Sequence, residues 1–289
     1  MICAAPGKPD RAVKSRPQIA HERAQLARAA LTRCRLCAHE CGVNRLAGEK
    51  GLCHAGAVAR VFCAQVEVSD ELELMPTFSV ALSGCDLRCD FCITGAESWN
   101  AHAGQSFDAS ALAAQAEAAL HNGARTIMVL GGEPTIHLPS ALEFVSRLPA
   151  SARLIWKTNA HGTAQARELL EDIFDVWLAD FKFGNNACAQ LLAKVPDYVR
   201  VVQENLLWAS THSELIVRHL LMPGHVECCW RPVAEWLAEQ IPGVKVNLRP
   251  GFWPAWHAGR HKELKSMLPA AEIDFAFGLA HELGLNLIS

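Results

Sequence analysis

Three cysteines that stand close together carry the strongest chemical signal in this chain. Cys85, Cys89 and Cys92 follow one another as C-x3-C-x2-C, directly after the apolar run at residues 78–82. Three thiolates at this spacing can hold three corners of a [4Fe–4S] cluster, which normally takes four cysteines. No fourth cysteine stands close by in the sequence, so one iron would remain open to a non-protein ligand. The motif therefore predicts chemistry at an open iron.

A second cysteine group lies nearer the N-terminus. Cys34, Cys37, Cys41 and Cys53 fall in a short segment punctuated by glycines. Four thiols at such spacing suit either tetrahedral zinc or a second iron–sulfur cluster, and the sequence does not choose between them. His39 or His54 could replace one thiol as a ligand, but we rank the four cysteines above either histidine. Buried free thiols are the structural alternative.

Composition limits the classes of function. The chain has 289 residues, of which 51% are hydrophobic, so it can form one large α/β domain with a small appendage. The net charge of −3 predicts neither a nucleic-acid partner nor binding to an anionic membrane. Twelve cysteines without a secretory signal predict thiolate ligation in a reducing compartment, the cytoplasm by default.

The sequence pattern predicts how the chain is organised. Residues 1–16 are expected to be a disordered lead-in, residues 17–72 a helix followed by the cysteine-rich segment, residues 73–260 the main domain, and residues 261–289 a closing helix. Within the main domain short apolar runs alternate with helical stretches, which is typical of βα units and a parallel sheet. We expect strands at 78–82, 126–130, 153–157, 176–180, 215–221 and 244–248. Six such strands predict an α/β fold, a partial (β/α)6 TIM-type barrel.

Helices are expected between these strands. The predicted ranges between the strands are 110–121, 139–148, 164–173, 199–210 and 231–240. Two further helices are expected before and after the strands, at 19–31 and 270–283. Right-handed crossovers would place the carboxyl ends of all strands on one rim, where barrel enzymes hold their active sites. The cysteine loop follows the first strand, and Gly131, Gly132, Glu133 and Pro134 follow the second.

Polar residues on the later strands extend this rim. Arg218 and His219 are adjacent in the fifth strand, so one of them must face the barrel interior, and we expect that residue to be His219. The aromatic loop 249–257 after the sixth strand is expected to contact substrate, or else to cover the barrel as a hydrophobic lid. Cys188, Cys228 and Cys229 are expected to be small buried hydrophobic residues, and the adjacent pair is not expected to share a ligand role.

Together these motifs resemble those of the radical S-adenosylmethionine (radical SAM) enzymes. The resemblance implies that S-adenosylmethionine chelates the open iron and that one electron from the cluster releases a 5′-deoxyadenosyl radical, which takes hydrogen from a substrate. It also implies roles for residues on the rim. The Gly-Gly-Glu-Pro turn would hold the methionine end and Phe91 would lie against the adenine; the further cofactor-binding candidates are Lys157, Asn159, Asp180 and Lys182.

More narrowly, the chain resembles the pyruvate formate-lyase activating enzyme-like proteins from about Cys34 to Leu285. The segments that carry this similarity include Asp180-Phe181-Lys182 and the run from Arg218 to His225. The resemblance implies an electron donor such as flavodoxin or ferredoxin. Three functions stay open: activation of a glycyl radical enzyme, direct radical modification of a peptide or small metabolite, and a non-catalytic iron–sulfur or zinc module.

Overall fold

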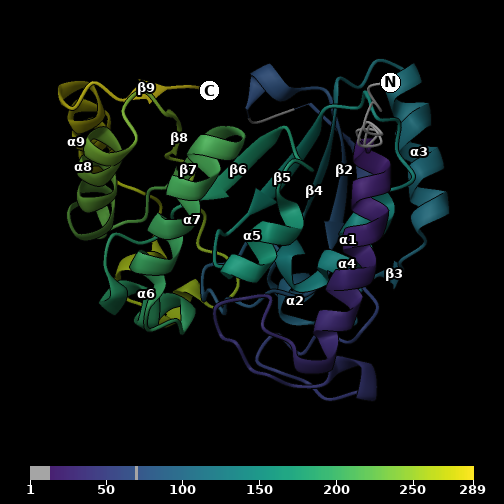
Figure 1. The fold of residues 1–289 in the computed structure, drawn as a ribbon. Coiled ribbons are helices and arrows are strands. Elements are labelled where there is room, and N and C mark those ends of the chain that lie inside the picture. The colour runs from purple at the N-terminus through teal and green to yellow at the C-terminus, as the bar shows by residue number, and fades with distance from the viewer. Residues whose placement is uncertain (1–13, 69–70) are drawn as a thin grey trace, which may run out of the picture.

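One sheet organises the protein (Figure 1). The computed structural model describes residues 14–68 and 71–289. Within them nine strands lie in the order β3-β1-β2-β4-β5-β6-β7-β8-β9. Their bounds are β1 (Arg60–Glu67), β2 (Thr77–Leu82), β3 (Gln105–Ser106), β4 (Thr126–Gly131), β5 (Leu154–Thr158), β6 (Val176–Asp180), β7 (Glu214–Leu220), β8 (Lys245–Arg249) and β9 (Asn286–Leu287).

The six predicted strands are confirmed as β2 and β4 to β8, each to within one residue at either end. They pair in parallel, as the repeated βα units require. The sequence did not predict β1, β3 or β9. Strand β1 runs antiparallel to β2, from Val61 opposite Leu82 to Glu67 opposite Thr77, and β3 pairs with β1. The sheet therefore ends in an antiparallel flank beside the strand that leads to the cysteine loop.

Helices connect the parallel strands and lie outside the sheet (Figure 1). Their bounds are α1 (Arg16–Ala30), α2 (Gly95–Trp99), α3 (Ala109–His121), α4 (Leu138–Val145), α5 (Ala164–Leu170), α6 (Asn186–Ala193), α7 (Tyr198–His212), α8 (Arg231–Gln240) and α9 (Ala270–Glu282). A π-helix at Val226–Trp230 precedes α8. The sequence predicted neither α2, α6 nor the π-helix. The expected lead-in falls mostly at residues 1–13, outside the described residues, and α1 begins at Arg16 after a capping box formed by Ser15 and Gln18.

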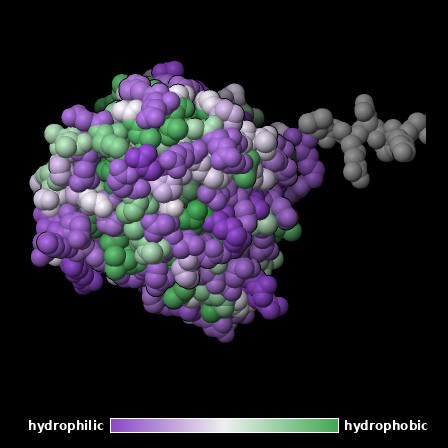
Figure 2. Space-filling model, turned by 90° about the vertical axis from the view of Figure 1, so that its left-hand side faces the viewer, coloured by the Kyte–Doolittle hydropathy of each residue, from purple (hydrophilic) through white to green (hydrophobic). Residues whose placement is uncertain are grey.

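The two faces of the sheet are buried by different partners. Inside the curve of the sheet, six side chains form a small apolar cluster: Leu74, Met128, Ile155, Val176, Leu178 and Ile216. The opposite face joins a larger core that extends to the helices, including residues of α1 and α9. Burial on both faces explains why the parallel strands are almost continuously apolar. On the surface near α8 and α9, hydrophobic residues are interspersed with hydrophilic ones (Figure 2).

The N-terminal segment is attached to the carboxyl end of the sheet. In Figure 1 the chain after α1 lies at the bottom of the view, on the side of α2. Cys37 forms a β-bridge with Gly162, and the Ala38 amide donates to the His161 carbonyl at 2.9 Å. The cysteine-rich segment therefore lies next to the rim on which the strand-end loops meet. Among the described residues, no helix combines the length and the apolar character needed to cross a membrane.

A buried histidine supports the start of the cysteine loop. His137 lies in the turn after β4, and its Nε2–H donates to the Ser83 carbonyl at 2.9 Å. Burial, with the nearby Arg45 charge, lowers the pKa of His137 from 6.5 to about 3. The unfolded chain therefore binds a proton below pH 6.5 that the folded chain does not. The contribution of the neutral His137 side chain to the free energy of unfolding is therefore present above pH 6.5 and is lost as the pH falls toward 3.

We expect His137→Gln to flatten this pH dependence. Between pH 7.5 and 5.5 the wild-type chain should lose about 1 kcal/mol of unfolding free energy that the variant does not lose. Urea unfolding of the cluster-free proteins at the two pH values measures the difference. An equal loss in both proteins would contradict the assignment.

Candidate functional site

The loop with Cys85, Cys89 and Cys92 is fixed by the elements around it. The Arg88 amide donates to the Ala193 carbonyl at 3.0 Å, and the Asp90 amide donates to the Leu192 carbonyl at 2.8 Å, so the end of α6 holds the middle of the loop. Cys85 and Cys89 are buried, whereas Cys92 is half-buried. The structure therefore places the three predicted ligands in one ordered loop at the carboxyl end of β2.

The chemistry of these sulfur atoms fits a cluster. The Leu87 amide donates to the Cys85 Sγ at 3.3 Å, and the Asn159 Nδ2 donates to the same atom at 3.7 Å. Burial raises the pKa of Cys89 to about 12 and that of Cys85 well above its usual value, so both stay protonated until a metal takes the thiolates. Among the described residues, Cys85, Cys89 and Cys92 do not have all three sulfur atoms within 4.8 Å of one another. The spacing of these sulfur atoms is therefore wider than a single ion requires.

The Gly131-Gly132 turn lies against this loop. A Cβ on Gly131, whose φ is +147°, would lie 2.0 Å from the Leu82 oxygen, and one on Gly132 would lie 2.1 Å from the Gly84 oxygen. The Gly132 amide donates to the Leu82 carbonyl and the Glu133 amide to the Gly84 carbonyl, both at 2.9 Å. The two glycines are therefore required by contact with the end of β2 and the cysteine loop.

The Glu133 carboxylate is fully engaged within the protein. Its oxygens accept hydrogen bonds from the Thr158 hydroxyl at 2.7 Å, from the backbone amide of Asn159 at 2.7 Å and from the backbone amide of Thr135 at 3.0 Å. Burial, followed by the charge of Asp86, raises the pKa of Glu133 to about 7. The side chain thus ties the end of β4 to the end of β5. Pro134 follows it as the buried first residue of a short 3-10 helix.

A buried aspartate inside the cysteine loop organises the next strand end. Asp86 accepts from the Asn159 Nδ2 at 2.8 Å and pairs with the His161 Nδ1 at 2.7 Å. Burial would raise the pKa of Asp86, but the hydrogen bond and charge of His161 outweigh it and lower the pKa. The His39 Nε2–H donates to the Asp86 carbonyl at 2.9 Å, which links the N-terminal segment to the loop.

Sequence reasoning identified Asn159 but missed Asp86 and His161, and it considered His39 only as a lower-ranked ligand of the N-terminal cysteine group. One signal was available for Asp86, because an acidic residue inside a short cysteine motif needs a partner when the loop is buried. The partners lie at positions 39 and 161, and no local pattern connects them to residue 86.

Charged residues meet at the ends of β6 and β7. The Lys182 ammonium forms an ion pair with Asp180, and the Arg218 Nε lies 3.6 Å from the Asp180 Oδ1 and 3.3 Å from the Glu71 Oε1. Although burial opposes it, the charges of Lys182 and Arg218 lower the pKa of Asp180, with a smaller contribution from Lys157. The Lys182 charge also lowers the pKa of Cys89, although the larger effect of burial raises it. The structure therefore brings the predicted residues Lys157, Asp180 and Lys182 together near the cysteine loop.

The prediction that His219 faces the barrel interior is wrong. Arg218 shares a strand face with Ile216 of the inner cluster and reaches Asp180 and Glu71. His219 points toward the outer layer, where its Nδ1–H donates to the Phe181 carbonyl at 2.6 Å and its ring lies 5.0 Å from that of Trp230. Burial lowers the pKa of His219 to about 4, so it is a neutral core histidine.

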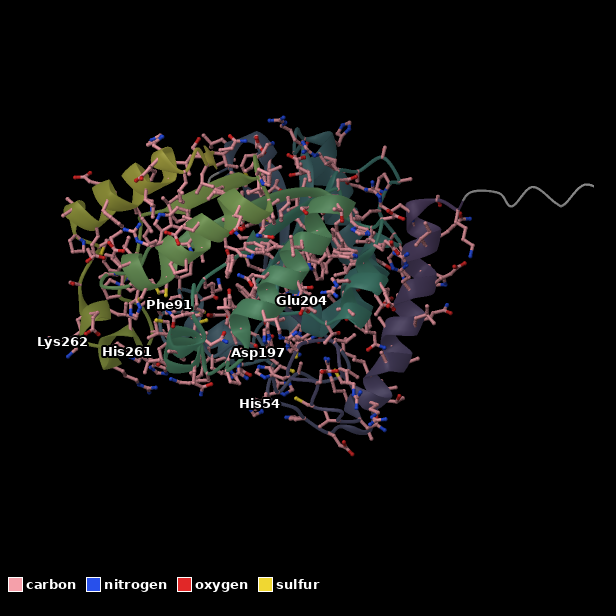
Figure 3. All side chains as sticks on the ribbon, turned by 60° about the vertical axis from the view of Figure 1, so that its left-hand side comes forward. His54, Phe91, Asp197, Glu204, His261 and Lys262 are labelled. Carbon is pink, nitrogen blue, oxygen red and sulfur yellow. The ribbon has the colours of Figure 1, made fainter. Side chains whose placement is uncertain are left out.

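Phe91 and the aromatic loop lie beside the cysteines. The Phe91 ring is 6.0 Å from that of Phe183, in an edge-on contact. The His257 amide donates to the Asp90 carbonyl at 2.8 Å, and the His261 Nε2 lies 2.7 Å from the Asp90 Oδ2. Phe91 and His261 are labelled close together in Figure 3. The loop at 249–257 is thus attached to the cysteine loop, while Trp253 remains exposed.

The N-terminal cysteines are close to one another but do not form a compact set. Cys34, Cys37 and Cys53 are buried and Cys41 is exposed. Burial raises the pKa of Cys37, and the sulfur charges of Cys53 and Cys34 act in the same direction. Among the described residues, no three of these cysteines have all their sulfur atoms within 4.8 Å of one another. This spacing is wider than one zinc ion needs.

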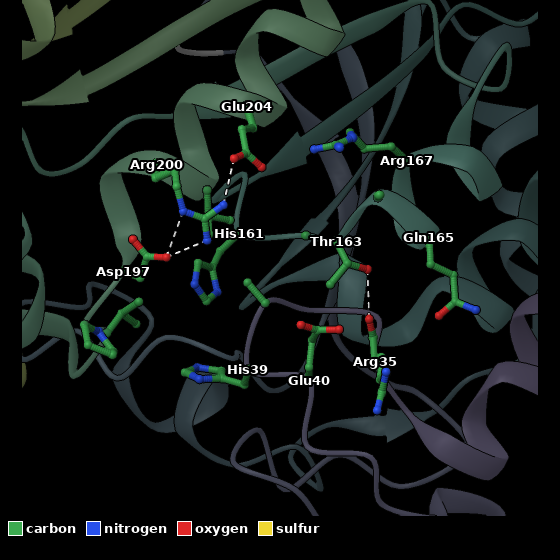
Figure 4. A pocket seen from close by; sticks show the side chains of 16 residues that line it. Arg35, His39, Glu40, His161, Thr163, Gln165, Arg167, Asp197, Arg200 and Glu204 are labelled. Atoms are coloured by element: carbon green, nitrogen blue, oxygen red, sulfur yellow. Dashed lines mark hydrogen bonds and ion pairs between the residues drawn. The ribbon is translucent and has the colours of Figure 1, made fainter.

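A cavity of about 710 Å³ lies next to the N-terminal segment. His39 and His161, which both bond to Asp86, line one side of it, and residues of α7 line another (Figure 4). On α7, Arg200 pairs with Asp197 at 2.5 Å and with Glu204 at 2.7 Å. Charged side chains therefore line part of the cavity, and His161 connects it to Asp86 of the cysteine loop.

Comparison with known proteins gives relatives over most of the chain. The uncharacterized protein MJ0674 of Methanocaldococcus jannaschii is 28% identical over 290 aligned positions, which cover 94% of this chain and 81% of that protein. Crystal structures of Streptococcus suis SuiB bound to S-adenosylmethionine and to the precursor peptide SuiA superpose with TM-scores of 0.54 and 0.53, at 16% and 15% identity.

The SuiB structures are similar in fold alone. They align with 71% and 70% of this chain, but the chain spans only 47% and 46% of the SuiB chains. The family comparison is more direct, since residues 80–237 match the Radical SAM superfamily. This match runs from the strand before the cysteine loop into α8 and covers more than half of the sequence, so the chain belongs to the radical SAM superfamily.

Proposed function

We propose that Cys85, Cys89 and Cys92 ligate the [4Fe–4S] cluster of a radical SAM enzyme and that this rim binds S-adenosylmethionine. The observation that carries the proposal is the contact between the cysteine loop and the Gly131-Gly132 turn, in which both glycines are sterically required. When bound, the cluster supplies the electron that cleaves S-adenosylmethionine, and the 5′-deoxyadenosyl radical so formed takes hydrogen from a substrate.

The residues of the chain would position these groups. The Glu133 carboxylate accepts hydrogen bonds from Thr158 and Asn159. The backbone of the Gly-Gly-Glu-Pro turn, and not this side chain, would therefore bind the methionine end. Asp180, Lys182 and Arg218 form a charged group near Cys89 and would orient the cofactor or substrate. Phe91 is proposed to lie against the adenine. Asn159 acts through Asp86 and the Cys85 sulfur, which makes it a positioning residue.

Replacement of Cys89 by Ala is expected to abolish reductive cleavage. The remaining two thiolates cannot hold the cluster, so 5′-deoxyadenosine formation with dithionite and S-adenosylmethionine should fall to the level of cluster-free protein. Cys63→Ala is the control, because Cys63 is a free cysteine in β1, outside the loop. Normal turnover by Cys89→Ala would refute the ligand assignment.

The substrate defines two forms of the proposal. In the first, the enzyme removes hydrogen from a backbone glycine of a glycyl radical enzyme, as the resemblance to activating enzymes suggests. In the second, it modifies a peptide or small metabolite directly. A precursor peptide is bound in one SuiB structure, and the cavity that His161 shares with Asp86 is one place where a substrate could lie. Both forms need a one-electron reductant, for which flavodoxin or ferredoxin is proposed.

Anaerobic assays with cell extract distinguish the two forms. For an activating enzyme we expect a lasting glycyl-type doublet by electron paramagnetic resonance, which appears only when extract, reductant and S-adenosylmethionine are all present. Direct modification predicts extract-stimulated 5′-deoxyadenosine without a lasting radical. Absence of cleavage by reconstituted protein under every condition would count against both forms and favour a binding module.

The N-terminal cysteines are proposed to hold a second metal centre, either an iron–sulfur cluster or zinc. We expect the Cys37→Ala, Cys41→Ala double variant to contain less iron or zinc per chain, measured by elemental analysis against Cys63→Ala. Unchanged content of both metals would make these cysteines packing residues.

A further inference from the structure

A third cysteine group lies outside the two already described. The four side chains are Cys188, His225, Cys228 and Cys229, and their ligand atoms all lie within 4.8 Å of one another. The sequence had assigned these cysteines to hydrophobic packing, with the adjacent pair pointing apart. Cys229 is buried as expected, but Cys228 is exposed, and the adjacent sulfur atoms lie only 4.0 Å apart, which contradicts the expectation that they point away from each other.

The distances match the edges of a tetrahedron around one ion. The Cys188 Sγ lies 3.7 Å from the Cys228 Sγ, and the His225 Nδ1 lies 3.5 Å from each of these two sulfur atoms. With zinc bond lengths of about 2.3 Å to sulfur and about 2.05 Å to nitrogen, a regular tetrahedron has edges of about 3.8 Å between sulfur atoms and about 3.6 Å between sulfur and nitrogen. The Cys188, His225 and Cys228 atoms therefore have the separations that a single zinc ion requires. The Cys229 Sγ lies 4.0 Å from the Cys228 Sγ and within 4.8 Å of the other two ligand atoms.

These separations also exclude the simpler alternatives. A disulfide needs its sulfur atoms at about 2.05 Å, and the shortest sulfur–sulfur distance here is 3.7 Å. A multi-iron cluster would hold its ligands farther apart than one ion does. Three thiols and an imidazole form a Cys3His set, which is a known ligand set of structural zinc.

The local backbone explains how adjacent cysteines converge. Cys228 and Cys229 lie in the π-helix Val226–Trp230, a wider turn that changes the direction of successive side chains. Cys188 comes from the first turn of α6, on the loop that follows β6. A Cβ on Gly184 would lie 2.3 Å from the Cys229 oxygen, so a glycine is required where this loop crosses the π-helix.

An amide side chain supports the sulfur atoms. The Asn185 Nδ2 donates to the Cys188 Sγ at 3.2 Å, lies 3.9 Å from the Cys229 Sγ, and donates to the Cys228 carbonyl at 2.7 Å. Hydrogen bonds from such an outer shell orient metal-bound thiolates and stabilise their charge. Cys228 is exposed, which gives an ion a path into the site.

We propose that Cys188, His225, Cys228 and Cys229 form a structural zinc site that joins α6 to the π-helix after β7. The opposite end of α6 accepts hydrogen bonds from the Arg88 and Asp90 amides of the catalytic cysteine loop. The zinc ion thus fixes the helix against which that loop lies. With four protein ligands the coordination shell is closed, so the ion is structural and not catalytic.

Zinc analysis of two matched variants tests the site. Cys228→Ser replaces an exposed ligand, and Cys63→Ser replaces a partly exposed cysteine in β1. When both variants are purified anaerobically from zinc-containing medium, Cys228→Ser should contain about one zinc ion per chain less than Cys63→Ser. The iron content of the two variants should be equal. Equal zinc content in both variants would overturn the proposal.

A measurement on the wild-type chain covers the case in which Cys228→Ser does not fold. Iodoacetamide labelling followed by peptide mass spectrometry reads Cys188 and Cys228 separately, before and after removal of zinc with a chelator. Zinc ligation predicts that both thiols are slow to react until the chelator is added. Equal labelling with and without chelator, or a disulfide between these two residues in the anaerobic protein, would refute the site.

Discussion

The contact between the Gly131-Gly132 turn and the end of β2 is the constraint on which the candidate site depends. Both glycines approach backbone oxygens more closely than any Cβ would allow, and two backbone hydrogen bonds hold them there. This contact fixes the cysteine loop relative to the turn. Glu133 and Asp86 then extend the arrangement to β5, because each is buried and each accepts hydrogen bonds from Asn159. A buried carboxylate is costly without such partners, so these side chains confine the rim to one geometry.

The cysteine loop is also held from its outer side. The end of α6 accepts its amides, Lys194 lies 3.2 Å from Asp90, and His261 contacts the same carboxylate. Support thus comes from segments separated by more than 100 residues in sequence. A radical enzyme needs a site that excludes side reactions, and a loop anchored on every side suits that need.

The strands and the cysteine loop could be predicted because their signals are local. Apolar runs buried on both faces define β2 and β4 to β8, and the cysteine spacing is read directly. The sequence analysis did not identify α6, nor the π-helix, which no simple period describes. Those two elements bring Cys188 to Cys228 and Cys229. Alternation correctly placed Arg218 and His219 on opposite faces, but the choice of face depends on Glu71 and Asp180, which are distant in sequence.

The central claim is that the cysteine loop holds a cluster with an iron open to S-adenosylmethionine. The most direct test is electron–nuclear double resonance on the reduced wild-type protein, with S-adenosylmethionine that carries 15N in its amino group and 17O in its carboxylate. The account predicts that the cofactor shifts the cluster spectrum and that both labels show hyperfine coupling to the cluster. A cluster spectrum unchanged by the cofactor, with no coupling to either label, would contradict it.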